Sequence, residues 1–143
     1  MGSKTKLMKH YLPIFNEILP FVDNYYEPFA GGMNVVEHIN HRIRIASDNN
    51  KYLIAMWKGL ISNTNRPYTI SKELYDKART EYNNGTNIEF DDFLIGWIGY
   101  VASFNGRFFD GGYSSHCYGS HSRDYISEQI KNIESQIPKL KDV

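Results

Sequence analysis

The spacing of hydrophobic residues predicts that the chain opens with an amphipathic helix over residues 4–19. Pro13 removes a backbone donor and crowds the preceding turn, so we expect a kink or a division of the helix there. Pro20 marks the expected end of the helix. The apolar positions, spaced as one helical face requires, are Leu7, Tyr11, Leu12, Phe15, Ile18 and Leu19.

Two short strands follow, separated by a glycine turn. Residues 22–27 are aromatic and predict a buried strand, and residues 42–46 are β-branched and predict a second strand. Between them we expect a turn at 28–32 and a helix at 33–39. Residues 50–62 carry a broad apolar helical face that we expect to pack on the sheet. This order predicts one βαβα unit of an α/β fold.

The next part of the chain is predicted to be helical. Residues 63–87 are polar and are interpreted as a surface excursion around a charged helix at 71–82. Residues 90–104 are strongly apolar and predict a buried helix. Gly96 and Gly99 weaken helical propensity and indicate close packing.

A loop and a last helix complete the pattern. Residues 104–125 contain almost no aliphatic side chains, so we expect that they build no core. Residues 124–137 place isoleucines at helical spacing and predict an amphipathic helix that ends at Pro138.

Composition indicates one soluble domain. The 143 residues carry 16 basic and 16 acidic side chains, so the overall charge neither supports nor excludes nucleic-acid binding. Cys117 is the single cysteine, and His116 and His121 lack the acid and thiol partners of a tetrahedral site, so we expect no disulfide and no metal. No apolar run approaches the roughly 20 residues of a membrane span. We therefore expect a cytoplasmic protein.

The turn after the first strand and the acid after the second are candidate ligand-binding elements. Glycine lets a ligand approach the backbone, and an acid at this place can accept hydrogen bonds from ribose hydroxyls. Asp48 follows Gly31 by 17 residues, near the spacing for that role. Because the third glycine of the dinucleotide fingerprint is missing, a plain tight turn is an alternative. Asp48 is also suited to cap the next helix.

The loop at 104–125 offers candidate nucleic-acid contacts. Arginines reach phosphates and base edges, and asparagine or aromatic side chains supply edge contacts or stacking. Asn105, Arg107 and Arg123 are the best candidates. The alternative is that both arginines are ordinary exposed side chains.

Four motifs resemble elements of Dam-like (D12 class) DNA adenine-N6 methyltransferases. Tyr26-Glu27-Pro28-Phe29-Ala30-Gly31-Gly32 and Ala46-Ser47-Asp48-Asn49 resemble the family's two cofactor motifs. Gly2-Ser3-Lys4 resembles its N-terminal Gly-x-Lys element, and Phe104-Asn105-Gly106-Arg107 resembles the start of its target-recognition region. The resemblance implies an α/β fold with a partial Rossmann-like S-adenosylmethionine-dependent methyltransferase sheet and a helical, loop-rich target-recognition portion.

The resemblance also implies residue roles, with S-adenosylmethionine as the cofactor. Glu27 would lie near the methionine part of the cofactor, and Asp48 would hold the ribose. The implied cofactor-binding residues are Gly2, Lys4, Glu27, Pro28, Phe29, Ala30, Gly31, Gly32, Asp48 and Asn49. The implied DNA-binding residues are Asn105, Gly106, Arg107, Tyr113 and Arg123.

Further expectations concern organisation and activity. The resemblance divides the chain into a cofactor-binding portion at 1–62, a target-recognition portion at 63–137 and a truncated return to the sheet at 138–143. The family's Asp-Pro-Pro-Tyr motif, whose acid and carbonyl hold the target amino group while its tyrosine stacks on the adenine, does not occur in the sequence. We therefore assign no catalytic residue, and we expect a methyltransferase fragment that is poor or inactive alone.

Two other hypotheses remain open. In the first, the chain is a non-catalytic remnant of such an enzyme that binds DNA or cofactor. In the second, it is a cofactor-binding protein unrelated to DNA. An incomplete sheet would expose a strand edge and an apolar face. The expected partners are therefore DNA and either the missing C-terminal half or a second copy of the chain, with no membrane and no metal.

Overall fold

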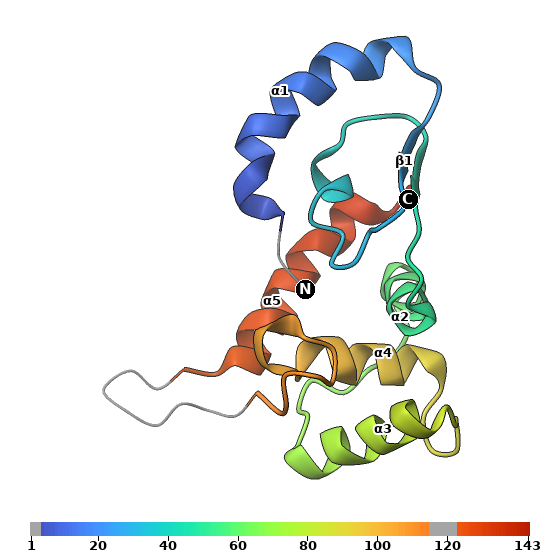
Figure 1. Ribbon diagram of the computed structural model, residues 1–143, viewed down its shortest axis with the longest axis vertical. Coiled ribbons are helices and arrows are strands. Elements are labelled where there is room, and N and C mark those ends of the chain that lie inside the picture. The colour runs from blue at the N-terminus through green and yellow to red at the C-terminus, as the bar shows by residue number, and fades with distance from the viewer. Residues whose placement is uncertain (1–3, 115–122) are drawn as a thin grey trace.

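The computed structural model describes residues 4–114 and 123–143, and it places a small sheet and one helix at one end and three packed helices at the other (Figure 1). No helix in these two ranges is long and apolar enough to cross a membrane. The helices are α1 (Met8–Ile18), α2 (Lys51–Ile61), α3 (Lys72–Asn84), α4 (Asp92–Val101) and α5 (Tyr125–Gln136), and the strands are β1 (Tyr25–Glu27) and β2 (Arg44–Ala46).

The two strands pair in parallel, with Tyr25 opposite Arg44 and Glu27 opposite Ala46. Both are shorter than predicted, and the expectation of a buried first strand is only partly met because Tyr26 is 57% exposed. Within the described residues the strands form a two-stranded sheet. The α/β prediction is therefore confirmed as a mixed helix and strand fold with a small parallel sheet.

The predicted helix at 33–39 is wrong. The segment contains only one 3₁₀ turn, Val36–His38. Gly31 and Met33 adopt positive φ angles of 50° and 57°, which interrupt any regular helix before it begins. The Val36 amide donates to the Glu27 carboxylate at 3.0 Å instead of to a helical carbonyl.

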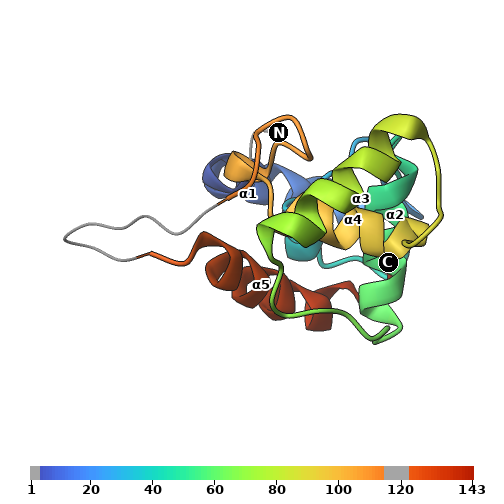
Figure 2. The ribbon, with the colours of Figure 1, turned by 90° about the horizontal axis from the view of Figure 1, so that it is seen from below.

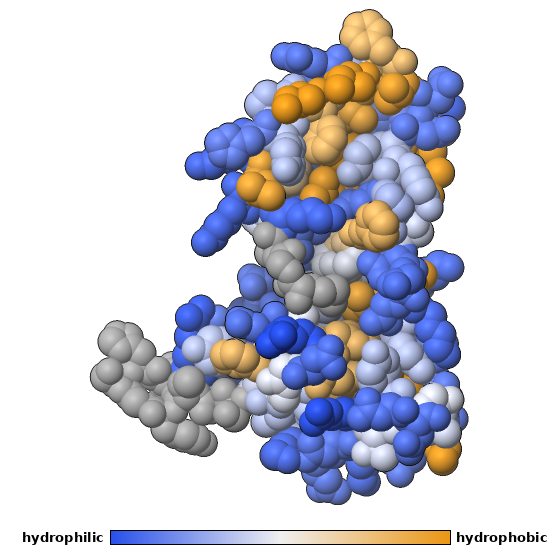
Figure 3. Space-filling model, in the orientation of Figure 1, coloured by the Kyte–Doolittle hydropathy of each residue, from blue (hydrophilic) through white to orange (hydrophobic). Residues whose placement is uncertain are grey.

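Helix α1 passes through Pro13 without being divided. The predicted end near Pro20 is confirmed, since α1 ends at Ile18 and a 3₁₀ turn leads to extended backbone. The inner face packs Met8 and Leu19 against Val35 and Ile39 in a second, smaller core. The outer face is apolar and visible at this end of the molecule (Figure 3), and its exposed residues are Leu7, Tyr11, Ile14, Ile18 and Phe21.

The main core lies where α2 crosses α4. A Cβ at Gly96 would lie 2.1 Å from the Tyr52 carbonyl oxygen, and a Cβ at Gly99 would lie 2.5 Å from the Phe109 ring, so the predicted close packing at both glycines is confirmed. Helix α2 was expected to pack on the sheet, but its principal neighbour is α4. The two helices are nearly all apolar where they meet, which favours helix-on-helix packing over contact with a sheet of two strands.

The charged helix predicted at 71–82 is confirmed as α3, which begins one residue later and runs two residues further, to Asn84. The Ser71 side chain accepts from the Leu74 amide, and Gly85 closes the helix in the left-handed conformation. The polar segment at 63–87 was expected to lie on the surface, but α3 within it buries Tyr75 and Ala78 against the main core.

The expectation that residues 104–125 build no core is wrong for the described part. Phe108 and Phe109 are 6% and 1% exposed. The Phe109 ring lies 5.2 Å from the Tyr75 ring and 5.1 Å from the Tyr82 ring. Aromatic side chains bury enough apolar area to form a core without aliphatic neighbours.

The last helix is confirmed and connects the two ends of the molecule. Asp124 caps α5, Ile126, Ile130 and Ile133 are buried, and Pro138 lies in the 3₁₀ turn that follows. Figure 2 shows α5 running beside the group formed by α2, α3 and α4. The Lys139 carbonyl after it accepts a hydrogen bond from Arg44 of β2 at 2.9 Å.

Candidate functional site

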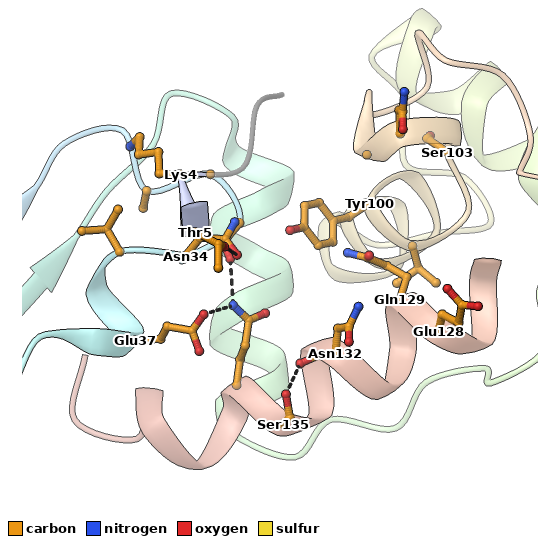
Figure 4. A pocket seen from close by; sticks show the side chains of 18 of the residues that line it. Lys4, Thr5, Asn34, Glu37, Tyr100, Ser103, Glu128, Gln129, Asn132 and Ser135 are labelled. Carbon is orange, nitrogen blue, oxygen red and sulfur yellow. Dashed lines mark hydrogen bonds between the residues drawn. The ribbon is translucent and has the colours of Figure 1, made fainter. Parts of the chain in front are cut away.

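A cleft of about 1130 Å³ lies between the glycine turn on one side and α4, α5 and the turn at 104–106 on the other. Figure 4 shows Lys4, Thr5, Asn34 and Glu37 on the first side and Tyr100 with residues of α5 on the second.

Asp48 fixes the glycine turn to the end of β2. Its Oδ2 accepts from the Gly31 amide at 2.9 Å, and its Oδ1 accepts from the Asn50 amide at 3.0 Å. The Ala30 amide donates to the Ser47 carbonyl at 2.9 Å, which also links the turn to the end of β2. The alternative role of Asp48 as the helix cap is wrong, because the Asn50 side chain caps α2. Each carboxylate oxygen of Asp48 accepts one bond here and has capacity for a second.

Glu27 braces the turn from beneath. It is 6% exposed, and its Oε1 and Oε2 accept from Lys4 Nζ at 3.2 Å and from the Val36 amide at 3.0 Å. Lys4 also donates to the Phe29 carbonyl at 3.1 Å. Burial and then the Glu27 charge raise the pKa of Tyr25 to about 12.

The carbonyls of the glycine turn are held by two helices. Trp57 Nε1 of α2 donates to the Gly31 carbonyl at 2.9 Å, and Gln136 Nε2 of α5 donates to the Gly32 carbonyl at 3.3 Å. A Cβ at Gly32 would lie 2.3 Å from the Tyr100 hydroxyl, so a side chain at this position would displace Tyr100. Glycine is therefore required at the two positions for different reasons. Gly31 adopts a positive φ, and Gly32 allows the Tyr100 hydroxyl to lie close to the backbone.

Tyr100 and Glu37 extend the cleft below the turn. Burial, followed by the nearby Glu37 charge, raises the pKa of Tyr100 to about 12, while a hydrogen bond from Gln129 opposes the rise. Glu37 accepts from Gln136 Nε2 at 3.0 Å and from Lys139 Nζ at 2.9 Å. Because its pKa is about 12, the Tyr100 phenol is neutral at physiological pH.

Arg123 forms a forked ion pair with Glu128 at the rim of the cleft. Its Nε lies 2.8 Å from Oε1, and its second nitrogen lies 2.9 Å from Oε2. This contact raises the pKa of Arg123 and lowers the pKa of Glu128. The guanidinium also stacks over Tyr125 at 5.0 Å.

The structure brings seven of the ten predicted cofactor residues to the wall of the cleft, and two others lie off it. Pro28 and Asn49 are exposed outside the lining. Gly2 lies outside the described residues, as do His116 and His121. The seven are Lys4, Glu27, Phe29, Ala30, Gly31, Gly32 and Asp48.

Only some of the predicted DNA-contacting residues line the cleft. Asn105, Gly106 and Arg123 line the same cleft. Arg107 is exposed outside the lining, and the Tyr113 hydroxyl donates to the Ile70 carbonyl at 2.7 Å. Their contacts with DNA remain predictions.

Sequence reasoning missed the contribution of α5. The sequence does carry a signal for this face: polar residues of α5 alternate with the buried isoleucines at helical spacing. Such residues lie on the side of the helix that faces away from the core. In residues 4–114 and 123–143 no group of three or more His, Cys, Asp or Glu is placed to hold a metal ion. The α5 residues that line the cleft are Tyr125, Glu128, Gln129, Asn132, Ser135 and Gln136.

Comparison with known proteins identifies one family. The family model described as D12 class N6 adenine-specific DNA methyltransferase matches residues 1–96. No curated protein matches the chain significantly. The matched span contains the glycine turn and Asp48, and it ends before the turn at 104–106.

Proposed function

The chain belongs to the D12 class of N6 adenine-specific DNA methyltransferases, and from this premise we propose that its cleft binds S-adenosylmethionine beside an adenine of DNA. The observation that carries the proposal is that residues predicted separately for cofactor and for DNA line one cleft. Its volume of about 1130 Å³ exceeds the ~300–1,000 Å³ of ordinary ligand pockets, which leaves room for two ligands.

Asp48 and the glycine turn form the proposed cofactor wall. The Asp48 carboxylate already orients the turn through the Gly31 amide, and its remaining acceptor capacity suits the two hydroxyls of a ribose. The absence of a side chain at Gly31 lets a ligand lie against the backbone, while the corresponding space at Gly32 is taken by the Tyr100 hydroxyl. On this basis the small parallel sheet is interpreted as part of a Rossmann-like methyltransferase sheet.

The second wall is proposed to receive the target base. An enzyme that modifies a base must take it out of the stack, and the exposed Arg107 and the rim residue Arg123 suit contacts with the flanking phosphates. Asn105 also lines the cleft, from the turn at 104–106. Residues 63–137 thus serve as the proposed target-recognition portion.

Bound S-adenosylmethionine would supply a methyl group on a sulfonium centre for transfer to adenine N6. Transfer requires the amino nitrogen to lie in line with that methyl group at near-attack distance. The 143 residues include no Asp-Pro-Pro-Tyr motif to hold the amino group. We therefore propose that this chain alone binds both ligands and transfers methyl groups slowly.

Calorimetric titration with S-adenosylhomocysteine tests the cofactor site. We expect saturable binding by the natural sequence and at least a tenfold weaker affinity for Asp48→Asn, since hydrogen bonds to charged groups contribute about 1.5–3 kcal/mol. Asp142→Asn, an exposed change near the C-terminus, is the matched control and should bind normally. Absence of binding by the natural sequence, or equal affinity in all three proteins, contradicts the proposal.

A tritiated-methyl assay on adenine-containing duplex tests the second part. The expected result is turnover near background. Turnover equal to that of a methyltransferase with the Asp-Pro-Pro-Tyr motif would refute slow transfer by this chain.

A further inference from the structure

Each lysine or arginine that lines the cleft is paired with a lining glutamate, and Asp48 is the one further acid of the lining among the described residues. Each lining glutamate meets a lining cation: Glu27 meets Lys4 at 3.2 Å, Glu37 meets Lys139 at 2.9 Å and Glu128 meets Arg123 at 2.8 Å. Among the described residues these three cations are all the lysines and arginines of the lining. The interior therefore provides little attraction for a phosphate, and it favours a neutral ligand that forms hydrogen bonds.

The neutral polar groups are concentrated on α5 and α4. Figure 4 shows Gln129 and Asn132 on α5 beside the Tyr100 ring, on the side opposite Asn34. Gln129 interacts with the Tyr100 hydroxyl. Asn132 is exposed at the cleft, its side-chain amide has no hydrogen-bond partner among the described residues and is open to a ligand, and its backbone carbonyl accepts from Ser135.

We propose that the Asn132 amide, supported by Gln129, reads the hydrogen-bonding edge of the acceptor adenine. This inference rests on the proposed function. An amide can pair in two-point fashion with adenine, donating to N7 and accepting from the N6 amino group. Guanine carries a carbonyl oxygen in place of that amino group, so the same amide discriminates against it. The paired cations and the Asp48 carboxylate then keep the phosphates at the rim while the base enters.

The cofactor also contains an adenine, so the source of the ring must be distinguished. Asn132 belongs to the helix that follows the predicted target loop, and it lies across the cleft from the glycine turn assigned to the cofactor. We therefore assign the amide to the acceptor base. Two separate measurements, one with oligonucleotide and one with S-adenosylhomocysteine, separate the two sources.

The test uses fluorescence anisotropy with labelled oligothymidylates that carry one central adenine or one central guanine. The natural chain should prefer adenine, and Asn132→Ala should reduce the ratio of the two affinities about tenfold without changing affinity for S-adenosylhomocysteine. Asn83→Ala on the exposed surface of α3 makes the same chemical change away from the cleft and should retain the full preference.

Three results would overturn the inference: no adenine preference in the natural chain, an unchanged preference in Asn132→Ala, or a loss of S-adenosylhomocysteine affinity with the base preference intact. The last would assign the amide to the cofactor's adenine. An adenine preference that depends on Asn132 in a chain without S-adenosylhomocysteine affinity would support the inference and refute the cofactor proposal alone.

Discussion

The two walls of the cleft are held in shape by different forces. The glycine-turn wall depends on directed polar contacts, such as those of Asp48 with two backbone amides and of Glu27 with Lys4 and Val36. The helical wall, formed by α4, α5 and the turn at 104–106, depends on apolar side chains that pack with α2 and α3 in the main core. We therefore expect substitutions on the glycine-turn wall to change ligand binding more than stability. Substitutions on the helical wall should change stability more than ligand binding.

Removal of a core ring from the helical wall should have the largest effect. Phe109→Ala should lower the free energy of unfolding by about 3–5 kcal/mol, because the ring is fully enclosed and leaves a cavity. The control on the other wall is Phe29→Ala, whose side chain is 76% exposed and whose loss should cost under about 0.5 kcal/mol. Urea denaturation measures both. Equal losses would abolish the distinction between the walls.

Paired glycine substitutions sharpen the comparison. Gly96→Ala would place a Cβ against the Tyr52 backbone and should destabilise the fold by about 1–3 kcal/mol. Gly32→Ala would instead meet the ends of two side chains, the Tyr100 hydroxyl at 2.3 Å and the Asn34 amide at 2.7 Å, and no backbone atom. We expect Gly32→Ala to reduce S-adenosylhomocysteine affinity while leaving the melting temperature almost unchanged. A melting temperature lowered as much as in Gly96→Ala would contradict this.

The rim ion pair offers a smaller, electrostatic test. Glu128→Gln should release Arg123 and strengthen DNA binding several-fold, with the slope of log affinity against log salt steeper by about one unit. Anisotropy at several salt concentrations measures this. The control is Glu73→Gln on α3, which removes the same charge far from the rim. If both variants behave alike, Arg123 has no specific role in DNA binding.

The smallest effect concerns alkaline pH. Because burial raises the pKa of Tyr100 from 10.0 to about 12, its contribution to stability is present below pH 10 and is lost as the pH rises toward 12. The free energy of unfolding should therefore fall more steeply across this range in the natural chain than in Tyr100→Phe. Identical slopes would show that the phenol is not held in its neutral form.

Periodicity predicted the helices well, and it failed where polar contacts decide the backbone. The isoleucine spacing of α5 and the charged helix α3 were predictable because each depends on neighbours in sequence. The segment at 33–39 has helix-like spacing, but its shape depends on Glu27, nine residues before Val36, which periodicity cannot register.

The glycine-turn wall of the candidate site was largely predictable, whereas on the helical wall only Asn105, Gly106 and Arg123 were named from the sequence. The glycine turn and Asp48 form a local motif with a fixed spacing, and the structure joins them through the bond from the Gly31 amide. The link from Gln136 to the Gly32 carbonyl spans 104 residues, so no local pattern reveals it. The prediction for Phe108 and Phe109 was wrong because a segment without aliphatic side chains can still build a core from aromatic rings.

Glycine-selective nuclear magnetic resonance tests the central claim, that the cofactor lies against the turn held by Asp48. A chain labelled with ¹⁵N only at its 11 glycines gives few signals, each reporting one backbone site. On addition of S-adenosylhomocysteine, the Gly31 and Gly32 amides should shift while Gly85, at the end of α3, stays unchanged. Unmoved signals from Gly31 and Gly32 at saturating ligand would contradict the account.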